Sequence, residues 1–589
     1  MAFQMNEILF RVGGAAGDGV ASTAETFARL CVRGGLYVHT YSSYQSVIRG
    51  GHGWTQVRAS EAPVLSQGED PNLVICLNQE TANIHAPVVQ VGGALLYDGS
   101  LVKVDGLTLR KDVRKVPLPM NETARGLGEP MLKNVVALGA ALALLEIPFA
   151  PLENGIKETF GHKKPEIVEM NLKAAHVGFD TLQGNGGPLG LGVQFSKYPG
   201  RMMITGNEAI CLAALAAGCK FYAAYPMTPA SSILHWLAAN GPRHGVVVKQ
   251  AEDELAVINM AIGAGHAGAR AMCATSGGGF SLMVEALGEA GMTETPVVCV
   301  LVQRAGPSTG VPTKTEQGDL NLALGAGQGD WPRAILAPRN TIDCFDATVK
   351  AFNLAEVYQT PVILMSDLYL GEGFRTAEEE QFNMAVPIHR GLLVDGNGDG
   401  KDYLRYKFTE DGVSPRAFPG MKGYQFTAGT DEHMEKGILI SDVLPGIPEW
   451  IEERRKMMDK RMRKLEGLRH DLSPPELWGA TGADLTIVSW GSTAMTVREA
   501  IIRLAAKGYK VNALEFFDIY PFKAEETQEI LDRVEKTLCV EGNFMGQFAH
   551  LLRAETGYKV DHMLTKYDGE PFEAREIVAR ATEVMEHGG

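Results

Sequence analysis

The chain has 589 residues, of which 45% are apolar and 21% are charged, and its formal net charge is −15. This length exceeds what one hydrophobic core supports, so we expect about three to four domains. The acidic balance argues against nucleic acid as a partner, because phosphate binding needs clustered cations. No apolar run is long enough for a membrane span and no secretory leader is apparent, so the sequence predicts a cytoplasmic protein without membrane contact.

Eight cysteines are spread along the chain and none forms a C-x-x-C pair. Several lie in apolar runs such as "PVVCVLVQ". This pattern predicts buried, reduced thiols and favours them over a metal or cluster site. Any iron–sulfur cluster is therefore expected on another chain.

The N-terminal part, residues 1–185, alternates strand-like and helix-like segments. A strand "EILFRVGG" leads through "GGAAGDGVAS" into a helix, and the strands "NLVICLN" and "GALLYDG" follow. Such alternation predicts an α/β domain with a parallel sheet. The Gly- and Pro-rich residues 186–200 are typical of a linker.

The first glycine-rich stretch lies where a phosphate-binding turn would be expected. Gly13, Gly14, Gly17 and Gly19 come between a strand and a helix, so we expect an anion there, such as coenzyme A, or a tight turn without a ligand. About twenty residues further on, where a dinucleotide fold carries an acid, the chain reads "YVHTYSSYQ", which disfavours NAD and FAD. Gly17-Asp18-Gly19 also lacks the downstream Asn of a thiamine diphosphate motif.

A second α/β domain is predicted over residues 201–371, and a third, with a βαβαβ pattern, over residues 481–589. Residues 372–480 are predicted to connect them. That segment contains the charged helix "PEWIEERRKMMDKRMRKLEGLRHDL", which mixes acids with bases and is expected to be a solvated linker helix. The fold class is thus α/β, with several domains built on mainly parallel sheets.

Polar residues follow several buried strands of the central domain. The acids at 252–254 begin an apolar helix, where an acid needs a partner to offset its desolvation. Thr275 and Ser276 open a glycine-rich helix start. Arg304 leaves the carboxyl end of a strand, where α/β folds bind ligands, and suits a small carboxylate. A surface arginine on a mobile loop is the alternative.

Three long motifs now show a resemblance to a known family: "GNEAICLAALAAGCKFYAAYPMTPASS", "QAEDELAVINMAIGAGHAGARAMCATSGGGFSLMVEALG" and "GPSTGVPTKTEQGD". Together they resemble the alpha subunit of 2-oxoacid:ferredoxin oxidoreductases. "GGAAGDGVASTAETFARLCVRGGLYV" and "YSSYQSVIRGGHGWTQVR" resemble the gamma domain that the 2-oxoglutarate type carries fused to the N-terminus. The resemblance covers nearly the whole chain.

The resemblance implies an architecture in which this chain holds half of a thiamine diphosphate site. Residues 201–371 would be the pyrimidine-binding domain, and 481–589 a transketolase C-terminal-like domain. The diphosphate domain, Mg²⁺ and an iron–sulfur cluster would lie on a separate beta subunit, in a complex of two alpha and two beta chains. Coenzyme A and ferredoxin would be the acyl and electron acceptors.

The resemblance also implies roles for single residues. Glu252 would hydrogen-bond the aminopyrimidine ring, while Thr228 and Arg304 would lie beside the substrate carboxylate. Pro229 and Pro226 would fix the turn that carries Thr228. The other implied cofactor contacts are Tyr225, Pro226, Thr275 and Ser276, and the candidates for a second substrate carboxylate are Ser308, Thr309 and Lys314.

A second carboxylate contact favours 2-oxoglutarate and succinyl-CoA over pyruvate or other 2-oxoacids, and the reaction could run as decarboxylation or as CO₂ fixation. Two other functions stay open from the sequence. One is a component of a non-redox thiamine enzyme, and the other is a nucleotide-binding or electron-transfer partner without an active site.

Overall fold

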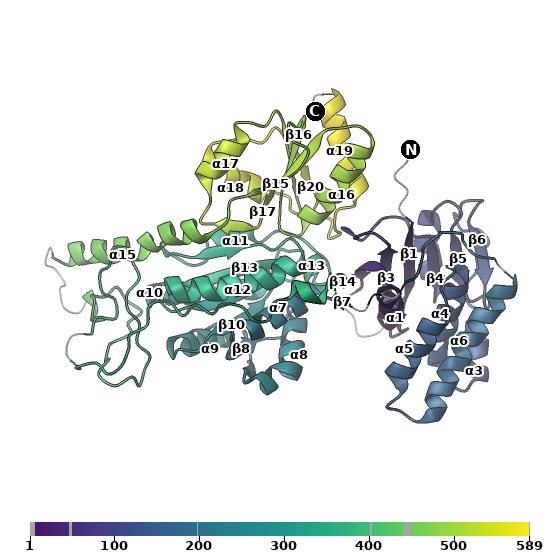
Figure 1. Cartoon of the computed structure of the whole chain (residues 1–589), viewed down its shortest axis with the longest axis horizontal. Coiled ribbons are helices and arrows are strands. Elements are labelled where there is room, and N and C mark those ends of the chain that lie inside the picture. Colours follow the sequence, from purple (N-terminus) through teal and green to yellow (C-terminus); the bar gives the residue numbers. More distant parts are fainter. Residues whose placement is uncertain are drawn as a thin grey trace. The chain divides into compact units, whose positions relative to one another are not determined.

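The computed structural model describes residues 6–45, 50–185, 187–196, 198, 200–400, 403–440 and 449–587. Residues 46–49 of the second N-terminal motif, and 186, 197 and 199 of the predicted linker, lie outside this range. The chain divides into two compact units (Figure 1). The first unit comprises Met1–Ile204 with Gly373–Gln381, and the second comprises Thr205–Glu372 with Phe382–Gly589.

The first unit is built on an eight-stranded sheet in the order β6-β5-β4-β1-β3-β2-β14-β7. The neighbours β1, β4, β5 and β6 pair in parallel, as βαβ units require. On the other side of β1, the strands β3, β2, β14 and β7 pair antiparallel. The sequence predicted a parallel sheet, and half of the sheet departs from that because β2 and β3 follow each other without a helix. The strands are β1 Glu7–Ala16, β2 Tyr37–Ser43, β3 Gly50–Ser60, β4 Leu73–Cys76, β5 Ala94–Tyr97, β6 Arg114–Pro117, β7 Arg201–Ile204 and β14 Arg375–Glu378.

Two strands of this sheet come from segments that the sequence placed elsewhere. Residues 201–204 were assigned to the central domain and 375–378 to the connecting segment. In the structure β7 and β14 pair with each other, and β14 also pairs with β2 at Arg375↔His39. The chain therefore leaves the first unit after β7 and re-enters it for one strand, which sequence periodicity alone does not reveal.

Two helices of the first unit cross at a pair of glycines. A Cβ on Gly139 of α4 would lie 2.0 Å from Ala175 O of α6, and a Cβ on Gly178 of α6 would lie 2.0 Å from Val136 O of α4. Only glycine allows the two backbones to approach this closely. The helices of this unit are α1 Val20–Arg33, α2 Gln79–His85, α3 Met120–Gly126, α4 Lys133–Leu144, α5 Ala150–Phe160 and α6 Pro165–Asn185.

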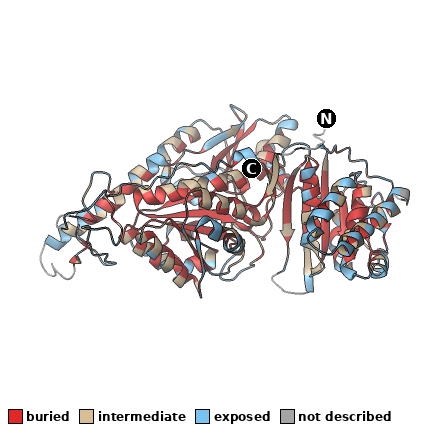
Figure 2. Ribbon diagram, turned by 60° about the horizontal axis from the view of Figure 1, so that its bottom comes forward, coloured by how far each residue is buried: buried red, intermediate tan, exposed pale blue. Residues whose placement is uncertain are grey.

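The second unit contains a seven-stranded sheet in the order β18-β12-β13-β11-β10-β8-β9. All neighbours pair in parallel except β12 and β18. Figure 2 shows the strands of its centre in red, because helices cover both faces. The strands are β8 Phe221–Ala224, β9 Val247–Gln250, β10 Ala271–Thr275, β11 Val297–Gln303, β12 Ala334–Leu336, β13 Pro361–Asp367 and β18 Asp518–Tyr520.

The C-terminal part of the second unit has its own five-stranded sheet, in the order β15-β17-β16-β19-β20. It shares one hydrophobic core with the central part, in which Trp490 and Phe548 belong to the same buried cluster as Phe280. Because β18 also joins the central sheet, the two parts form a single unit. The strands are β15 Glu476–Gly479, β16 Leu485–Trp490, β17 Val511–Phe516, β19 Thr537–Glu541 and β20 His562–Thr565.

The charged helix α15 (Glu449–Asp471) is anchored by buried cations, so the expectation of a solvated linker helix is wrong. Lys460 and Lys464 are both 0% exposed, and their Nζ atoms bond the buried carboxylate of Glu294, at 2.6 Å for Lys464. These two charges hold the pKa of Glu294 well below its usual range despite burial, while burial lowers the pKa of Lys464 to about 7. A buried carboxylate thus pairs with one face of an otherwise polar helix.

The remaining helices cover the two sheets of the second unit. Among the described residues, no helix is both long and apolar enough to span a bilayer. The helices are α7 Gly206–Ala216, α8 Ser231–Asn240, α9 Glu254–His266, α10 Gly277–Met292, α11 Leu320–Leu324, α12 Thr341–Tyr358, α13 Leu368–Glu372, α16 Thr493–Ala506, α17 Ala524–Leu531, α18 Gln547–Thr556 and α19 Ala574–His587.

Candidate active site

Four adjacent parallel strands bring most of the predicted site residues to one edge of the central sheet. The strands β11, β10, β8 and β9 are neighbours, so their carboxyl ends meet at the same edge. Thr275 is the last residue of β10, and Arg304 directly follows β11. The turn after β8 carries Tyr225, Pro226 and Thr228, and the loop after β9 carries Glu252.

Arg304 is held against the turn that carries Thr228. Its Nη1 donates to the Thr228 carbonyl oxygen at 2.8 Å and lies 3.3 Å from the Met227 Sδ. Arg304 is only 8% exposed, so it is not the surface arginine that the sequence left open. Burial lowers the pKa of its guanidinium, while the charges of Asp319 and Glu254 raise it. A guanidinium stays protonated in proteins, so this edge carries a fixed, nearly buried cation.

The three consecutive acids after β9 lie in three different environments. Glu252 is exposed, and Asp253 caps α9 by accepting a hydrogen bond from the Ala256 N–H at 2.8 Å. Glu254, the first residue of α9, is 3% exposed, and its Oε1 is buried without a hydrogen-bond partner. Burying a carboxylate oxygen without a hydrogen-bond partner costs free energy. We therefore expect this oxygen to bond a ligand.

The glycine run after Ser276 makes room for two carboxylates at the start of α10. A Cβ on Gly277 would lie 2.5 Å from Asp319 Oδ2, and one on Gly279 would lie 2.5 Å from Glu254 Oε1 and 2.1 Å from Thr275 Oγ1. Both glycines already belong to the helix, so the run serves close packing and is not a flexible loop. Ser276 is 0% exposed, and its hydroxyl also lacks a partner.

The loop after Arg304 places the three remaining candidates in different surroundings. Ser308 and Thr309 are exposed, and the Ser308 carbonyl oxygen would lie 3.7 Å from a Cβ on Gly278 at the start of α10. Lys314 instead forms an ion pair with Glu570 of the C-terminal part. Ser308 and Thr309 therefore border the edge of the sheet, whereas the charge of Lys314 is already balanced within the chain.

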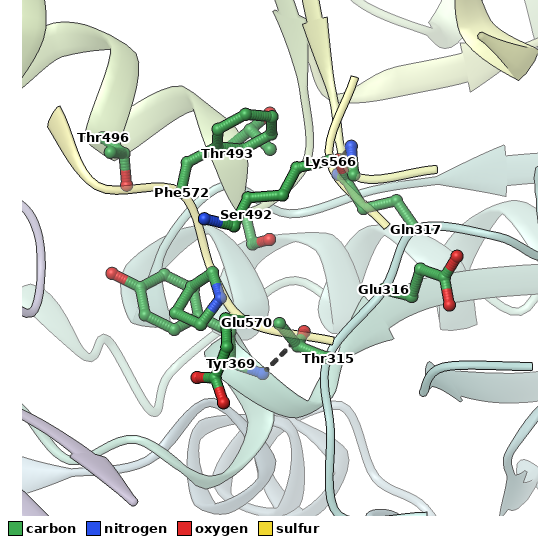
Figure 3. A pocket seen from close by; sticks show the side chains of 12 residues that line it. Thr315, Glu316, Gln317, Tyr369, Ser492, Thr493, Thr496, Lys566, Glu570 and Phe572 are labelled. Carbon is green, nitrogen blue, oxygen red and sulfur yellow. Dashed lines mark hydrogen bonds between the residues drawn. The ribbon is translucent and has the colours of Figure 1, made fainter. Parts of the chain in front are cut away.

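A small cavity of about 30 Å³ lies beyond this loop, between the central and C-terminal parts (Figure 3). Its polar groups already have partners within the chain. Thr315 Oγ1 accepts from the Tyr369 N–H at 3.2 Å, and Lys566 Nζ bonds Glu576, which lies outside the lining, at 2.7 Å. A cavity of this size holds a single water molecule. It is therefore part of the seam between the two parts and not the substrate site.

The N-terminal glycines lie differently from the phosphate loop that the sequence predicted. Gly13 and Gly14 belong to β1 and pair with Trp54 and Gly53, so only Gly17 and Gly19 remain in the turn before α1. Asp18 fills that turn, with Oδ2 accepting from the Ala15 N–H and Oδ1 from Lys133 Nζ, both at 2.8 Å. No described side chain caps the first turn of α1, whose N-cap is Gly19, so an anion contact at this turn stays a prediction.

All eight cysteines are buried, and none forms a disulfide. Within the described part of the chain, no three His, Cys, Asp or Glu side chains gather in a way that could hold a metal ion. At the edge of the central sheet, the orphaned oxygens of Glu254 and Ser276 fit the polar edge of an aminopyrimidine ring. The described residues thus suit the pyrimidine half of a thiamine site.

Comparison with known proteins identifies the family. Three family profiles match: "Pyruvate flavodoxin/ferredoxin oxidoreductase, thiamine diP-bdg" over residues 212–453, "Pyruvate ferredoxin/flavodoxin oxidoreductase" over 10–181, and "Pyruvate:ferredoxin oxidoreductase core domain II" over 483–577. The alpha subunit of a Sulfolobus 2-oxoacid:ferredoxin oxidoreductase is 31% identical over 98% of this chain and 97% of its own length. This chain belongs to the alpha subunits of the 2-oxoacid:ferredoxin oxidoreductases.

Further relatives of this alpha subunit include the 2-oxoglutarate oxidoreductase subunit KorA of Mycobacterium tuberculosis, which is 31% identical over 98% of this chain and 91% of its own length. A solved 2-oxoglutarate:ferredoxin oxidoreductase from Magnetococcus marinus, with 2-oxoglutarate, coenzyme A and succinyl-CoA bound, is 35% identical. The match covers 98% of this chain and 100% of that chain, with a TM-score of 0.89. The predicted family and α/β fold class are confirmed.

The sequence predicts no individual role for Glu254 or Asp319 of the alpha subunit, yet both carboxylates lie against the start of α10. Their signal was present in the pattern, because Gly277 and Gly279 mark positions where another group approaches the helix. The sequence did not say which group, since both carboxylates arrive from other segments.

Proposed function

We propose that this alpha subunit acts with a beta subunit in a thiamine-dependent oxidoreductase that interconverts 2-oxoglutarate plus coenzyme A and succinyl-CoA plus CO₂. The observation that carries the proposal is the buried Arg304 cation at the Thr228 turn, beside a buried carboxylate without a partner. Two relatives support 2-oxoglutarate as the substrate: the Magnetococcus enzyme, which has 2-oxoglutarate, coenzyme A and succinyl-CoA bound, and KorA.

Arg304 would bind the carboxylate next to the reacting oxo group. Its Nη1 is engaged by the Thr228 turn, which fixes the plane of the guanidinium and leaves its other nitrogens for a ligand. A fixed guanidinium loses little freedom on binding a carboxylate. Ser308 and Thr309 are the candidates for the distal carboxylate of 2-oxoglutarate, because both are exposed near α10.

Glu254 is the better candidate for the acid that contacts the aminopyrimidine ring, a role that the resemblance implies for Glu252. Glu254 is 3% exposed within this chain and its Oε1 has no hydrogen-bond partner, whereas Glu252 is exposed on the surface that the beta subunit would cover. Thr275, Ser276, Tyr225 and Pro226 would complete the pyrimidine side. Thiamine diphosphate, when bound, supplies the electron sink for loss of CO₂ from a 2-oxoacid.

The remaining parts of the catalytic centre would come from the beta subunit, including Mg²⁺, the diphosphate site and an iron–sulfur cluster, with ferredoxin as electron acceptor. Large apolar side chains around the site support a covering partner: Tyr225 is 38% exposed, Leu255 49% and Leu282 47%. The proposed assembly has two alpha and two beta chains and lies in the cytoplasm. Its reaction could run as decarboxylation or as CO₂ fixation.

The test compares two isosteric variants two residues apart, Glu254→Gln and Glu252→Gln. Each is assembled with the beta subunit and thiamine diphosphate, and reduction of a viologen dye that depends on 2-oxoglutarate and coenzyme A is measured without oxygen. We expect Glu254→Gln to lose about 100-fold or more in kcat with the complex still assembled, as loss of an acid–base group does. Glu252→Gln should stay within about threefold of the wild type, because the proposal gives it no contact with the ring.

The opposite result, loss in Glu252→Gln with activity retained in Glu254→Gln, would return the role to Glu252. Full activity in both would exclude this helix start from the chemistry. Comparing kcat/KM for 2-oxoglutarate with that for pyruvate tests the substrate, and a preference for pyruvate would contradict the proposal.

A further inference from the structure

Asp319 approaches the candidate site from a segment that none of the predicted roles uses. It directly precedes α11, and its backbone N–H donates to Gln303 Oε1 at 3.1 Å, while Gln303 Nε2 donates to the Ser366 carbonyl oxygen at 3.2 Å. Because Gln303 is the last residue of β11 and Arg304 the next, the same strand end fixes Asp319 and carries the cation. The position of Asp319 beside Arg304 is therefore built into the sheet.

Asp319 is partly buried, and one oxygen of its carboxyl group is buried without a hydrogen-bond partner. Its Oδ2 is inaccessible to solvent and makes no hydrogen bond, and it lies 2.5 Å from where a Cβ on Gly277 would be. The start of α10 therefore faces this carboxylate directly. Helix dipoles favour negative charge at their amino ends, so α10 and Arg304 together offset part of the cost of burying Asp319.

Acidic side chains outnumber basic ones around Asp319 before any ligand arrives. Arg304 supplies one positive charge, Glu254 at the start of α9 also acts on Arg304, and the charge of Asp319 acts on Glu316 in the same loop. Burial raises the pKa of Asp319 to about 6 although Arg304 opposes the shift, and burial and neighbouring acids raise the pKa of Glu316 to about 6. A substrate carboxylate at Arg304 would add another negative charge to this cluster.

We propose that Asp319 is a positioning residue for Arg304 that takes up one proton from solvent when the carboxylate of a 2-oxoacid binds to this guanidinium. The inference rests on the proposed function, because it assumes that Arg304 binds the substrate carboxylate. The incoming anion replaces Asp319 as the counter-charge of Arg304. The neutral Asp319 carboxyl then keeps its place against Gly277 without repelling the ligand.

Proton uptake on binding is measured directly by calorimetry of the assembled alpha–beta enzyme with thiamine diphosphate. The probe is glutarate, which keeps both carboxylates and lacks the reactive oxo group. Titrations at pH 7.0 in two buffers with different heats of ionisation give the number of protons taken up. We expect a value near one for the wild type and near zero for Asp319→Asn, with Glu316→Gln, the matched control, close to the wild type.

The pH dependence provides a second readout that a purely structural role would not change. If glutarate binds to the form with a protonated Asp319, its Kd should rise roughly eightfold from pH 6.5 to 7.5 in the wild type and less than twofold in Asp319→Asn. At pH 7.5 the Asn variant should bind glutarate more tightly than the wild type, because it carries no charge to neutralise.

Proton uptake that persists in Asp319→Asn, or that disappears in Glu316→Gln instead, would overturn this inference while leaving the proposed function intact. The variant Arg304→Ala separates the two. Loss of glutarate binding in it supports the role of Arg304, and binding as tight as in the wild type would overturn both the inference and that role.

Discussion

Replacing Gly279 by alanine tests whether the packing of α10 on Glu254 matters for catalysis. The new Cβ would lie 2.1 Å from Thr275 Oγ1 and 2.5 Å from Glu254 Oε1, far inside van der Waals contact. Restoring an ordinary separation requires the carboxylate to move by about 1 Å, and a displacement of that size costs roughly 100-fold in rate at a catalytic centre. We therefore expect kcat/KM of the Gly279→Ala complex to fall about 100-fold.

The matched control is Gly278→Ala, one residue earlier in the same helix. Its Cβ would meet only the Ser308 carbonyl oxygen at 3.7 Å, an ordinary contact. Both substitutions gain up to about 1 kcal/mol of helix propensity, whereas only Gly279→Ala adds an overpacking cost of about 1–3 kcal/mol. The difference between the variants therefore isolates the steric effect.

The assay is anaerobic, 2-oxoglutarate-dependent reduction of a viologen dye by the reconstituted complex, with thermal unfolding of each variant as a check of folding. Gly278→Ala should keep activity within about twofold of the wild type, as expected for an exposed site. Equal activities for the two variants, or equal losses, would refute the reasoning that the glycine at 279 serves the carboxylate of Glu254.

Two further predictions concern stability. Glu294→Gln leaves buried ammonium groups such as that of Lys464 unpaired and should lower unfolding stability by about 3–5 kcal/mol, seen as a lower urea midpoint. The pKa of Glu294 is depressed in the folded state, so the stability that its carboxylate contributes is present above pH 4.5 and lost as pH falls. The difference in unfolding stability between Glu294→Gln and the wild type should therefore shrink in acid. The control Glu289→Gln should cost little. Gly178→Ala should destabilise the first unit by about 1–3 kcal/mol or more, detected by limited proteolysis, whereas Gly155→Ala, whose Cβ would meet nothing closer than 3.6 Å, should not. An unaffected urea midpoint or an unaffected proteolysis rate would contradict the respective prediction.

Local sequence patterns predicted the α/β class and the central domain as the place of the site. Alternating strands and helices predicted α/β units because the periods of apolar residues are local properties of the chain. The position of Arg304 after a strand predicted ligand binding at a carboxyl strand end, and the structure brings the ends of β8, β9, β10 and β11 to one edge. The long motifs identified the family, which the comparisons confirm.

Only the tertiary structure decided which neighbouring residues share an environment. Glu252, Asp253 and Glu254 are adjacent in sequence, yet one is exposed, one caps a helix and one is buried, because α10 covers a single face of the α9 start. In the same way, the cations of α15 are buried because Glu294 arrives from the end of α10, and Asp319 is tied to the strand end that carries Arg304 because Gln303 bonds its backbone. Burial and pairing depend on which segments pack together over long sequence separations, and no local pattern encodes that.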